Sequence, residues 1–320
     1  MRAMVQISYG PPDVIVLQEI AKPSPNSKEL LIRIQATTVG PSNCAFRKGD
    51  PFMIKLLYGL SKPKFEIGGT EFAGVIEAVG KEVQHFKPGD RILGMSVKNF
   101  GTYAEYMCIS EDSPLALIPD GLTFEEAVGI CDGGTTALTF LRDQAKLRKR
   151  QKVLINGASG AVGIYAVQLA KFFGAEVTGV CSRLNESLVR NAGADFVIDY
   201  TREDFTKSDK AYDIVFDAVG KRSFMECKRV LKPAGMYLTT EPRLSTLIQM
   251  MWTSLFKGKR AIFATAGLIQ NKANLKFLME LTNNGTLKAV IDRRFPLESL
   301  PDAHKYVETE RKKGNVIIQI

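Results

Sequence analysis

Three glycines set three residues apart form the strongest chemical signal in the sequence. Gly157, Gly160 and Gly163 follow a short apolar run, 153–155, and precede a stretch whose apolar residues have helical spacing, 164–172. Glycine permits a tight turn and lets the backbone approach a phosphate closely. A helix start adds free N–H groups and the positive end of a dipole. The order of strand, glycine turn and helix predicts a dinucleotide site, and the alternative is a turn that only packs tightly.

The segments around this turn repeat the alternation of strand and helix. Further strands are expected at 174–181, 196–200, 213–220, 235–240 and 260–266. Strands that alternate with helices indicate a doubly wound parallel sheet of the α/β class. The residues predicted to bind the coenzyme lie in the glycine turn or toward the ends of the other strands: Gly157, Ser159, Gly160, Ala161, Val162, Gly163, Ser182, Arg183, Tyr200, Ala218, Val219, Thr240 and Thr265.

The end of the second strand predicts which coenzyme binds. A site that prefers NAD usually has an acid there, bonded to the ribose 2′-hydroxyl. This strand ends in Cys181, Ser182 and Arg183 instead. Arg183 can form bidentate hydrogen bonds with a 2′-phosphate, Ser182 can donate a hydrogen bond to it, and the Tyr200 ring can cover it. We therefore expect NADPH, although Arg183 can also be read as a solvated surface charge.

Composition excludes several classes of protein. The 320 residues are 45% hydrophobic and 24% charged, which suits a soluble globular protein with two domains. No apolar run is long enough to span a bilayer, and no signal or transit pattern opens the chain. The 5 cysteines contain no C-x-x-C pair, as expected for reduced thiols. We expect a cytoplasmic protein without integral membrane association.

The chain is basic, with a net charge of +9 and basic clusters at 146–150, 257–260 and 311–313. Such clusters attract anions, either the coenzyme or a polyanion. Each cluster taken alone is better explained as a solvated loop or helix end. No nucleic-acid motif with interleaved aromatic residues accompanies them, so no nucleic-acid partner is expected.

The two ends of the chain differ from the middle. Short strands with many prolines and glycines between them are expected up to residue 122, and they indicate a compact, partly closed β-barrel. These strands are expected at 14–17, 30–36, 72–80, 90–94 and 100–106, with a turn at 87–90. Thr123 and Glu126 form a capping-box pattern that begins a helix, and another helix starts at 133–140. A strand at 287–296, a helix at 300–308 and a strand at 315–320 are expected to return to the first domain.

Five segments together resemble the medium-chain dehydrogenase/reductase superfamily, and they lie at 87–91, 103–106, 157–163, 193–195 and 231–235. The resemblance covers nearly the whole chain. It implies a GroES-like β-barrel catalytic domain, residues 1–122 and 287–320, split around a Rossmann domain, residues 123–286. It also implies an active site in the cleft between the two.

Metal ligands divide this superfamily into branches. In the zinc alcohol dehydrogenases a cysteine ligand matches Gly40 and a histidine ligand matches Thr70, and neither residue here suits zinc. The cysteine-rich structural-zinc lobe is absent from the sequence. His85 and His304 have no partner at ligand spacing, and Cys44 lacks companions, so we expect Cys44 to be a pocket-wall or core thiol. The chain is similar to the zinc-free branch of quinone oxidoreductases and enone reductases.

This branch implies a particular reaction. Without a Lewis acid, an alcohol is hard to polarise for oxidation, whereas quinones and α,β-unsaturated carbonyls accept hydride conjugately. The expected activity is hydride transfer from NADPH to such small molecules. The resemblance places 40–43 and 131–136 near the nicotinamide. There Asn43 and Thr135 can bond the carboxamide or the substrate oxygen, or serve only as turn former and helix cap. The proton that completes the reaction is expected from water or a tyrosine. Tyr58 is the candidate donor, with core packing as its alternative.

The apolar stretch 244–256 can serve as a substrate lid, a subunit contact or, with the basic cluster that follows it, a membrane-surface contact. A homodimer through the sixth strand is expected by analogy. Two other functions stay open: an NAD(P)-dependent alcohol or aldehyde oxidoreductase, and a nucleotide-sensing protein associated with RNA or a membrane.

Overall fold

The computed structural model describes residues 1–241, 243–256, 258–264 and 271–320. Its contacts divide the chain into two compact units, Met1–Asp132 with Gln270–Ile320, and Gly133–Ile269. The division falls inside α3 (Phe124–Leu138) and groups α8 (Lys272–Asn283) with the first unit. The sequence analysis assigned both of these helices to the Rossmann domain, and its domain boundaries stay a prediction.

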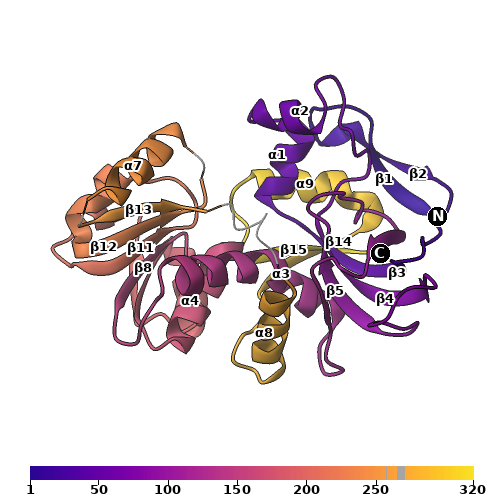
Figure 1. Ribbon diagram of the computed structural model, residues 1–320. Helices are drawn as coiled ribbons and strands as arrows, with labels where there is room; N and C mark the ends of the chain where they lie inside the picture. The colour runs from indigo at the N-terminus through magenta and orange to yellow at the C-terminus, as the bar shows by residue number, and fades with distance from the viewer. Residues whose placement is uncertain (242, 257, 265–270) are drawn as a thin grey trace. The chain divides into compact units, whose positions relative to one another are not determined.

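Six parallel strands form the sheet of the second unit, in the order β10-β9-β8-β11-β12-β13. The strands are β8 (Lys152–Asn156), β9 (Glu176–Cys181), β10 (Phe196–Asp199), β11 (Tyr212–Asp217), β12 (Leu231–Thr239) and β13 (Arg260–Phe263). The helices are α4 (Ala161–Phe172), α5 (Glu186–Asn191), α6 (Phe224–Cys227) and α7 (Leu244–Ser254), and Figure 1 shows α4 beside β8 and α7 beside β13. This is the strand order of a doubly wound Rossmann sheet, as predicted.

The strands of this sheet are apolar because helices cover them. Val153, Leu154 and Ile155 of β8 are fully buried, as are Ile214 and Val215 of β11. Short apolar runs between turn residues were therefore a reliable signal for these strands.

The first unit is a mainly antiparallel barrel organised around one long strand. β3 pairs with β4, β6 and β15, and the sheet order is β14-β15-β3-β4-β5-β7. Its strands are β3 (Glu29–Val39), β4 (Glu71–Val79), β5 (Arg91–Met95), β6 (Tyr106–Ser110), β7 (Leu115–Leu117), β14 (Ile291–Pro296) and β15 (Asn315–Gln319), with a separate hairpin of β1 (Arg2–Gln6) and β2 (Ile15–Glu19). The GroES-like β-barrel is confirmed.

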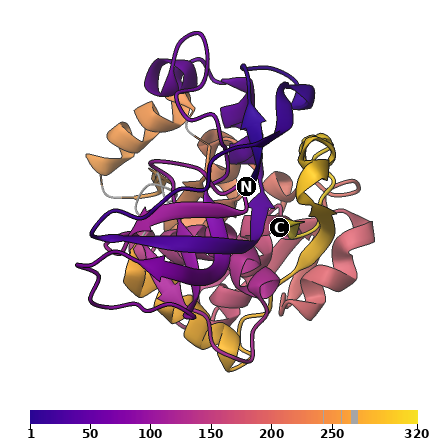
Figure 2. The same cartoon turned by 90° about the vertical axis from the view of Figure 1, so that its right-hand side faces the viewer.

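The helices of this unit are α1 (Pro41–Lys48), α2 (Met53–Tyr58), α8 and α9 (Leu300–Glu308). The yellow C-terminal segment with α9 and β15 lies beside the indigo N-terminal strands in Figures 1 and 2, so the tail returns to the first unit as expected. The predicted capping box is present: the Thr123 N–H donates to Glu126 at 2.9 Å and the Glu126 N–H donates to Thr123 at 3.2 Å.

Two local predictions were wrong. The segment 100–106 is not a strand up to Tyr106, because Phe100 and Gly101 have φ angles of 54° and 98° and turn the chain there. The helices expected at 122–129 and 133–140 are largely one helix, α3. Gly133 does not break it; a Cβ there would lie 2.4 Å from the Ala161 carbonyl oxygen, so glycine serves close packing.

Among the described residues, none of the helices combines the length and the apolar character that crossing a membrane requires.

Candidate functional site

The glycine turn connects β8 to α4 in the second unit. Gly157 has a φ angle of 77° and its N–H donates to the Val180 carbonyl at 3.1 Å, while the Gly160 N–H donates to the Gly157 carbonyl at 3.0 Å. Gly160 is the N-cap of α4 and has no side chain to satisfy the first helical N–H groups. Those donors are therefore available to a phosphate.

The three glycines serve two different purposes. A Cβ on Gly163 would lie 2.1 Å from the Gly157 carbonyl oxygen, and one on Gly157 would lie 2.4 Å from Val219. A Cβ on Gly160 would meet only the Gly157 oxygen, at 3.4 Å. Gly157 and Gly163 are thus required by packing, whereas Gly160 leaves room at the helix start. This cradle fits the pyrophosphate of a dinucleotide.

The other candidate coenzyme residues lie along the same edge of the sheet. Asn156 of β8 pairs with Asp217 of β11 and with Val180 of β9, Asp217 pairs with Thr239, and Cys181 of β9 pairs with Asp199. These strands therefore end within one residue of one another. The residues that follow these strand ends are Gly157, Ser182, Arg183, Tyr200, Ala218, Val219 and Thr240. Strand order reverses between β8 and β11, which is where dinucleotides bind in such sheets. Thr265 lies outside the described residues.

Asp217 is a site residue that the sequence analysis missed. It is fully buried at the end of β11 and accepts hydrogen bonds from the Asn156 side chain at 2.9 Å and from the Arg222 N–H at 2.8 Å. It thereby shapes the turn that carries Ala218 and Val219. A carboxylate ending a buried apolar strand was the signal available in the sequence.

The carboxyl end of β9 presents an available cation. Arg183 is exposed, and it makes no ion pair within the part of the chain that the structure describes, whereas Arg190 pairs with Glu186. Tyr200 is 59% exposed, at the end of β10. On the inner side of this edge, Ser159 accepts a hydrogen bond from Asn185 at 3.0 Å.

A buried hydrogen-bond chain connects the two positions that match zinc ligands in the resemblance. The Gly40 N–H donates to the Asn43 side-chain oxygen at 2.8 Å, and the Asn43 amide donates to the Thr70 hydroxyl at 3.2 Å. Thr70 in turn donates to Glu71 at 2.7 Å, and Thr38 donates to the other carboxylate oxygen at 2.6 Å. Asn43 therefore has a fixed orientation at the start of α1.

Burial and the charge of Asp132 raise the pKa of Glu71 above its ordinary range, and burial raises the pKa of Asp132 as well. Burial lowers the pKa of Lys312 to about 8, while the charges of Asp132 and Asp292 oppose that shift. The sequence analysis placed Asp132 near the nicotinamide only as part of 131–136, and it included Lys312 only in the basic cluster 311–313; it proposed no specific role for either residue. In the described residues, no three His, Cys, Asp or Glu side chains gather as a metal site.

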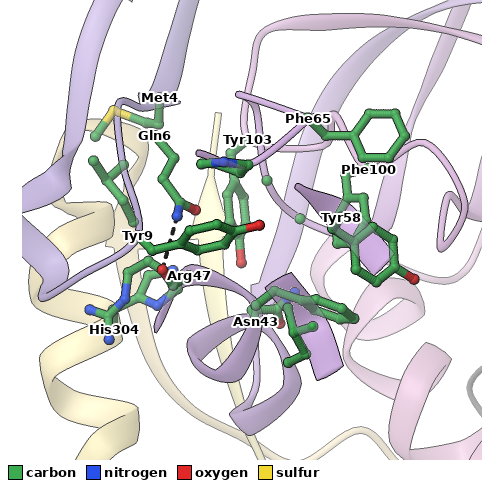
Figure 3. Close-up of a pocket in the computed structure, with 16 residues that line it drawn as sticks. Met4, Gln6, Tyr9, Asn43, Arg47, Tyr58, Phe65, Phe100, Tyr103 and His304 are labelled. Carbon is green, nitrogen blue, oxygen red and sulfur yellow. Dashed lines mark hydrogen bonds between the residues drawn. The ribbon is translucent and has the colours of Figure 1, made fainter. Parts of the chain in front are cut away.

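Asn43 and Tyr58 line one cavity of about 40 Å³ in the first unit (Figure 3). The Tyr58 ring packs edge-on against Phe46 at 5.2 Å and Phe100 at 5.4 Å. Tyr58 therefore does contribute to packing, and its role as proton donor stays a prediction. Thr135 is fully buried in α3, in the part of that helix that belongs to the second unit.

Cys44 has one neighbour that the sequence analysis did not identify, although no group of three potential metal ligands includes it among the described residues. The fold brings the Cys44 sulfur to 3.4 Å from His304 Nδ1. The two residues are far apart in the chain, so sequence spacing could not reveal the contact. Burial raises the pKa of Cys44 to about 12, which makes it a core thiol.

A Rossmann sheet with a phosphate cradle and a GroES-like barrel in one chain define an oxidoreductase that uses a nicotinamide coenzyme. Family models agree: residues 26–120 match the alcohol dehydrogenase GroES-like domain, and residues 192–318 match a model described as zinc-binding dehydrogenase.

Relatives identify the family. The chain is 30% identical over 331 residues to a chloroplastic quinone-oxidoreductase homolog of Spinacia oleracea, covering 100% of this chain and 98% of the relative. It is 29% identical over 330 residues to a chloroplastic NADPH-dependent alkenal/one oxidoreductase of Arabidopsis thaliana, covering 99% and 79%. The solved quinone oxidoreductase from Coxiella burnetii superposes with a TM-score of 0.90 at 27% identity, covering 100% and 99%. The chain therefore belongs to the medium-chain dehydrogenase/reductase superfamily, in its quinone oxidoreductase branch.

Proposed function

We propose that this protein is a zinc-independent, NADPH-dependent reductase of quinones or α,β-unsaturated carbonyls. The observation that carries the proposal is the strand edge of the second unit. There the phosphate cradle at Gly160 and the available Arg183 follow neighbouring parallel strands, and no acid ends β9.

Arg183, Ser182 and Tyr200 account for the choice of NADPH. A guanidinium that is not committed to a carboxylate can bind a 2′-phosphate with charge-assisted hydrogen bonds. The Ser182 hydroxyl can add a donor, and the exposed Tyr200 ring can cover the phosphate. The relative from Arabidopsis thaliana whose name includes NADPH supports the same choice.

The chain's own residues have limited but definite tasks in this reaction. A bound nicotinamide supplies the hydride. Asn43 has one amide hydrogen committed to Thr70, and its second can donate to the oxygen of an acceptor. Tyr58 is the proposed donor of the proton that completes the reduction, and aromatic rings pack around it.

Zinc independence is supported by the donor set. Gly40 has no ligating side chain, and the Thr70 hydroxyl already bonds Asn43 and Glu71. Neutral hydroxyl and amide groups in this arrangement are poor partners for zinc, which prefers cysteine, histidine and carboxylate ligands.

The test is an NADPH-oxidation assay across quinones, enones, aldehydes and alcohols, with and without a chelator. We expect turnover of quinones or enones that a chelator does not reduce. Turnover restricted to aldehydes or alcohols and abolished by the chelator would favour the second candidate, an alcohol dehydrogenase. This second candidate is included because the family model that matches residues 192–318 is described as a zinc-binding dehydrogenase.

We also propose a homodimer. β13 ends the sheet of the described residues at one side, and α7 beside it exposes an apolar face that includes Ile248, Met251 and Trp252. Large exposed apolar patches mark association surfaces.

The cytoplasmic location expected from the sequence stays a prediction, since two relatives are named as chloroplastic.

A further inference from the structure

Four buried polar atoms without hydrogen-bond partners belong to residues that line the cavity of the first unit. They are the Tyr9 hydroxyl, Nε and Nη1 of Arg47, and Nε2 of His304. Arg47 and His304 are each only 1% exposed. A buried polar group without a partner is costly, and such a group calls for a bound ligand or water. Three such side chains around one cavity indicate a built binding site.

All four atoms can act as donors. Arg47 is charged, and only its third nitrogen, Nη2, bonds a partner, the Glu308 carboxylate. The Cys44 thiol keeps its proton because its pKa is raised to about 12, and it lies 3.4 Å from His304 Nδ1. The thiol also lies 3.9 Å from the His304 carbonyl oxygen, to which it can donate. In the tautomer in which Nδ1 accepts from the thiol, Nε2 carries the imidazole hydrogen. The site therefore offers donors from Tyr9 and Arg47, and from His304 in that tautomer, which is the complement of an anion.

The local charges favour an anion with a single charge. The Glu308 carboxylate is shared by Arg47 and by Lys48, which lies 3.1 Å from it. Two cations on one carboxylate leave one positive charge in excess. A single carboxylate neutralises that charge, whereas a phosphate dianion would leave a net negative charge.

The other end of the cavity is apolar. Phe65, Phe100 and Tyr58 lie on one side of the view in Figure 3, and Tyr9, Arg47 and His304 lie on the other. Ring centroids of Phe65 and Phe100 are 5.5 Å apart, so this end is closely packed. The volume of about 40 Å³ has room for about three water molecules. A ligand must therefore be small, with one anionic end and a short apolar end.

We propose that this cavity binds a short-chain carboxylate, with the carboxylate at Arg47, Tyr9 and His304 and the alkyl group toward Tyr58 and Phe100. The site does not require the coenzyme, and its test is independent of hydride transfer. Asn43 and Tyr58 line the same cavity, so an occupant is expected to affect how these two residues contact an acceptor.

The test is calorimetric titration of the full chain, without coenzyme, with formate, acetate, propionate and butyrate at constant ionic strength. Acetamide is the neutral probe of the same shape as acetate. We expect acetate or propionate to bind and acetamide to bind at least about tenfold more weakly, as a lost charge-assisted contact implies. Equal binding of acetamide would show that the site does not select an anion, and no binding of any carboxylate would show that water alone fills the cavity. Either result would overturn the proposal.

Two variants locate the site. Tyr9→Phe removes one hydroxyl and should weaken acetate about threefold to tenfold. Tyr212→Phe makes the same change at a buried tyrosine of β11, in the other unit, and should leave acetate affinity unchanged. Both retain the ring, so folding is preserved better than by removing Arg47. Acetate binding that Tyr9→Phe leaves intact, or that both variants weaken equally, would place the anion elsewhere and refute the assignment.

Discussion

At the scale of single residues, the chemistry depends on which polar groups already make hydrogen bonds or ion pairs within the protein. Thr70 bonds Asn43 and Glu71, so the position that matches a zinc ligand is part of a protein network. Arg183 makes no ion pair among the described residues, and it is the group that we propose distinguishes NADPH from NADH. The sequence identified Arg183 because it ends a strand. It could not identify the Cys44–His304 contact, because the two residues meet only when α9 packs beside α1.

Arg183→Ala should raise the Michaelis constant for NADPH about tenfold to a hundredfold, since one charge-assisted contact contributes roughly 1.5–3 kcal/mol. The constant for NADH should change less than about twofold, because NADH has no 2′-phosphate. The control is Arg190→Ala, which removes an exposed arginine that already pairs with Glu186. Steady-state kinetics with both coenzymes measure the effect, and an equal loss for NADPH and NADH would refute the role of Arg183.

His304 should give the protein an acid-sensitive stability. Burial lowers the pKa of His304 from 6.5 to about 3, so below pH 6.5 the unfolded chain binds a proton that the folded chain does not. This contribution is present above pH 6.5 and is lost as pH falls toward 3. Between pH 7.5 and 4.5 the wild type should lose about 2–3 kcal/mol more than His304→Asn, by proton linkage. Urea unfolding at both pH values measures this difference, and equal losses in the two proteins would contradict it.

At the scale of elements, the sequence predicted best where one local pattern decided the structure. The strand, glycine turn and helix around 153–172 formed as expected because buried apolar runs and glycine turns depend on neighbouring residues. The strand expected at 100–106 failed because Phe100 adopts a left-handed conformation that composition does not reveal. The hydrogen-bond network of the barrel could not be predicted from the sequence, because Thr38, Asn43 and Thr70 come from separate segments.

The two kinds of glycine in the turn should respond differently to alanine. Gly163→Ala forces a Cβ to 2.1 Å from a carbonyl oxygen, and it should cost about 1–3 kcal/mol of stability, like other overpacked sites. Gly160→Ala finds its nearest atom at 3.4 Å and should stay within about 1 kcal/mol of the wild type. It should nonetheless weaken NADPH about tenfold by crowding the phosphate. Chemical unfolding and coenzyme titration separate these effects, and unchanged NADPH affinity in Gly160→Ala would contradict the cradle.

At the scale of the whole molecule, the superfamily was predictable because five separated motifs agree, whereas the oligomeric state was not, because no motif encodes it. The exposed apolar face of α7 is the physical basis for the proposed dimer.

Met251→Glu places a charge on a side chain that is 70% exposed, and it should convert a dimer to a monomer in light scattering. Leu117→Glu changes a 57% exposed leucine of β7 and should leave the dimer intact. A wild-type monomer, or a dimer that survives Met251→Glu, would exclude this surface.

The most direct measurement follows the hydride itself. Protein shown by elemental analysis to be free of zinc is mixed with NADPH deuterated at the transferred position and with an enone in ordinary water. We predict reduced product that contains one deuterium at the carbon β to the carbonyl, formed at the same rate when a chelator is present. Product without deuterium, or turnover that appears only after zinc is added, would contradict the proposal that this chain passes hydride directly from NADPH without a metal.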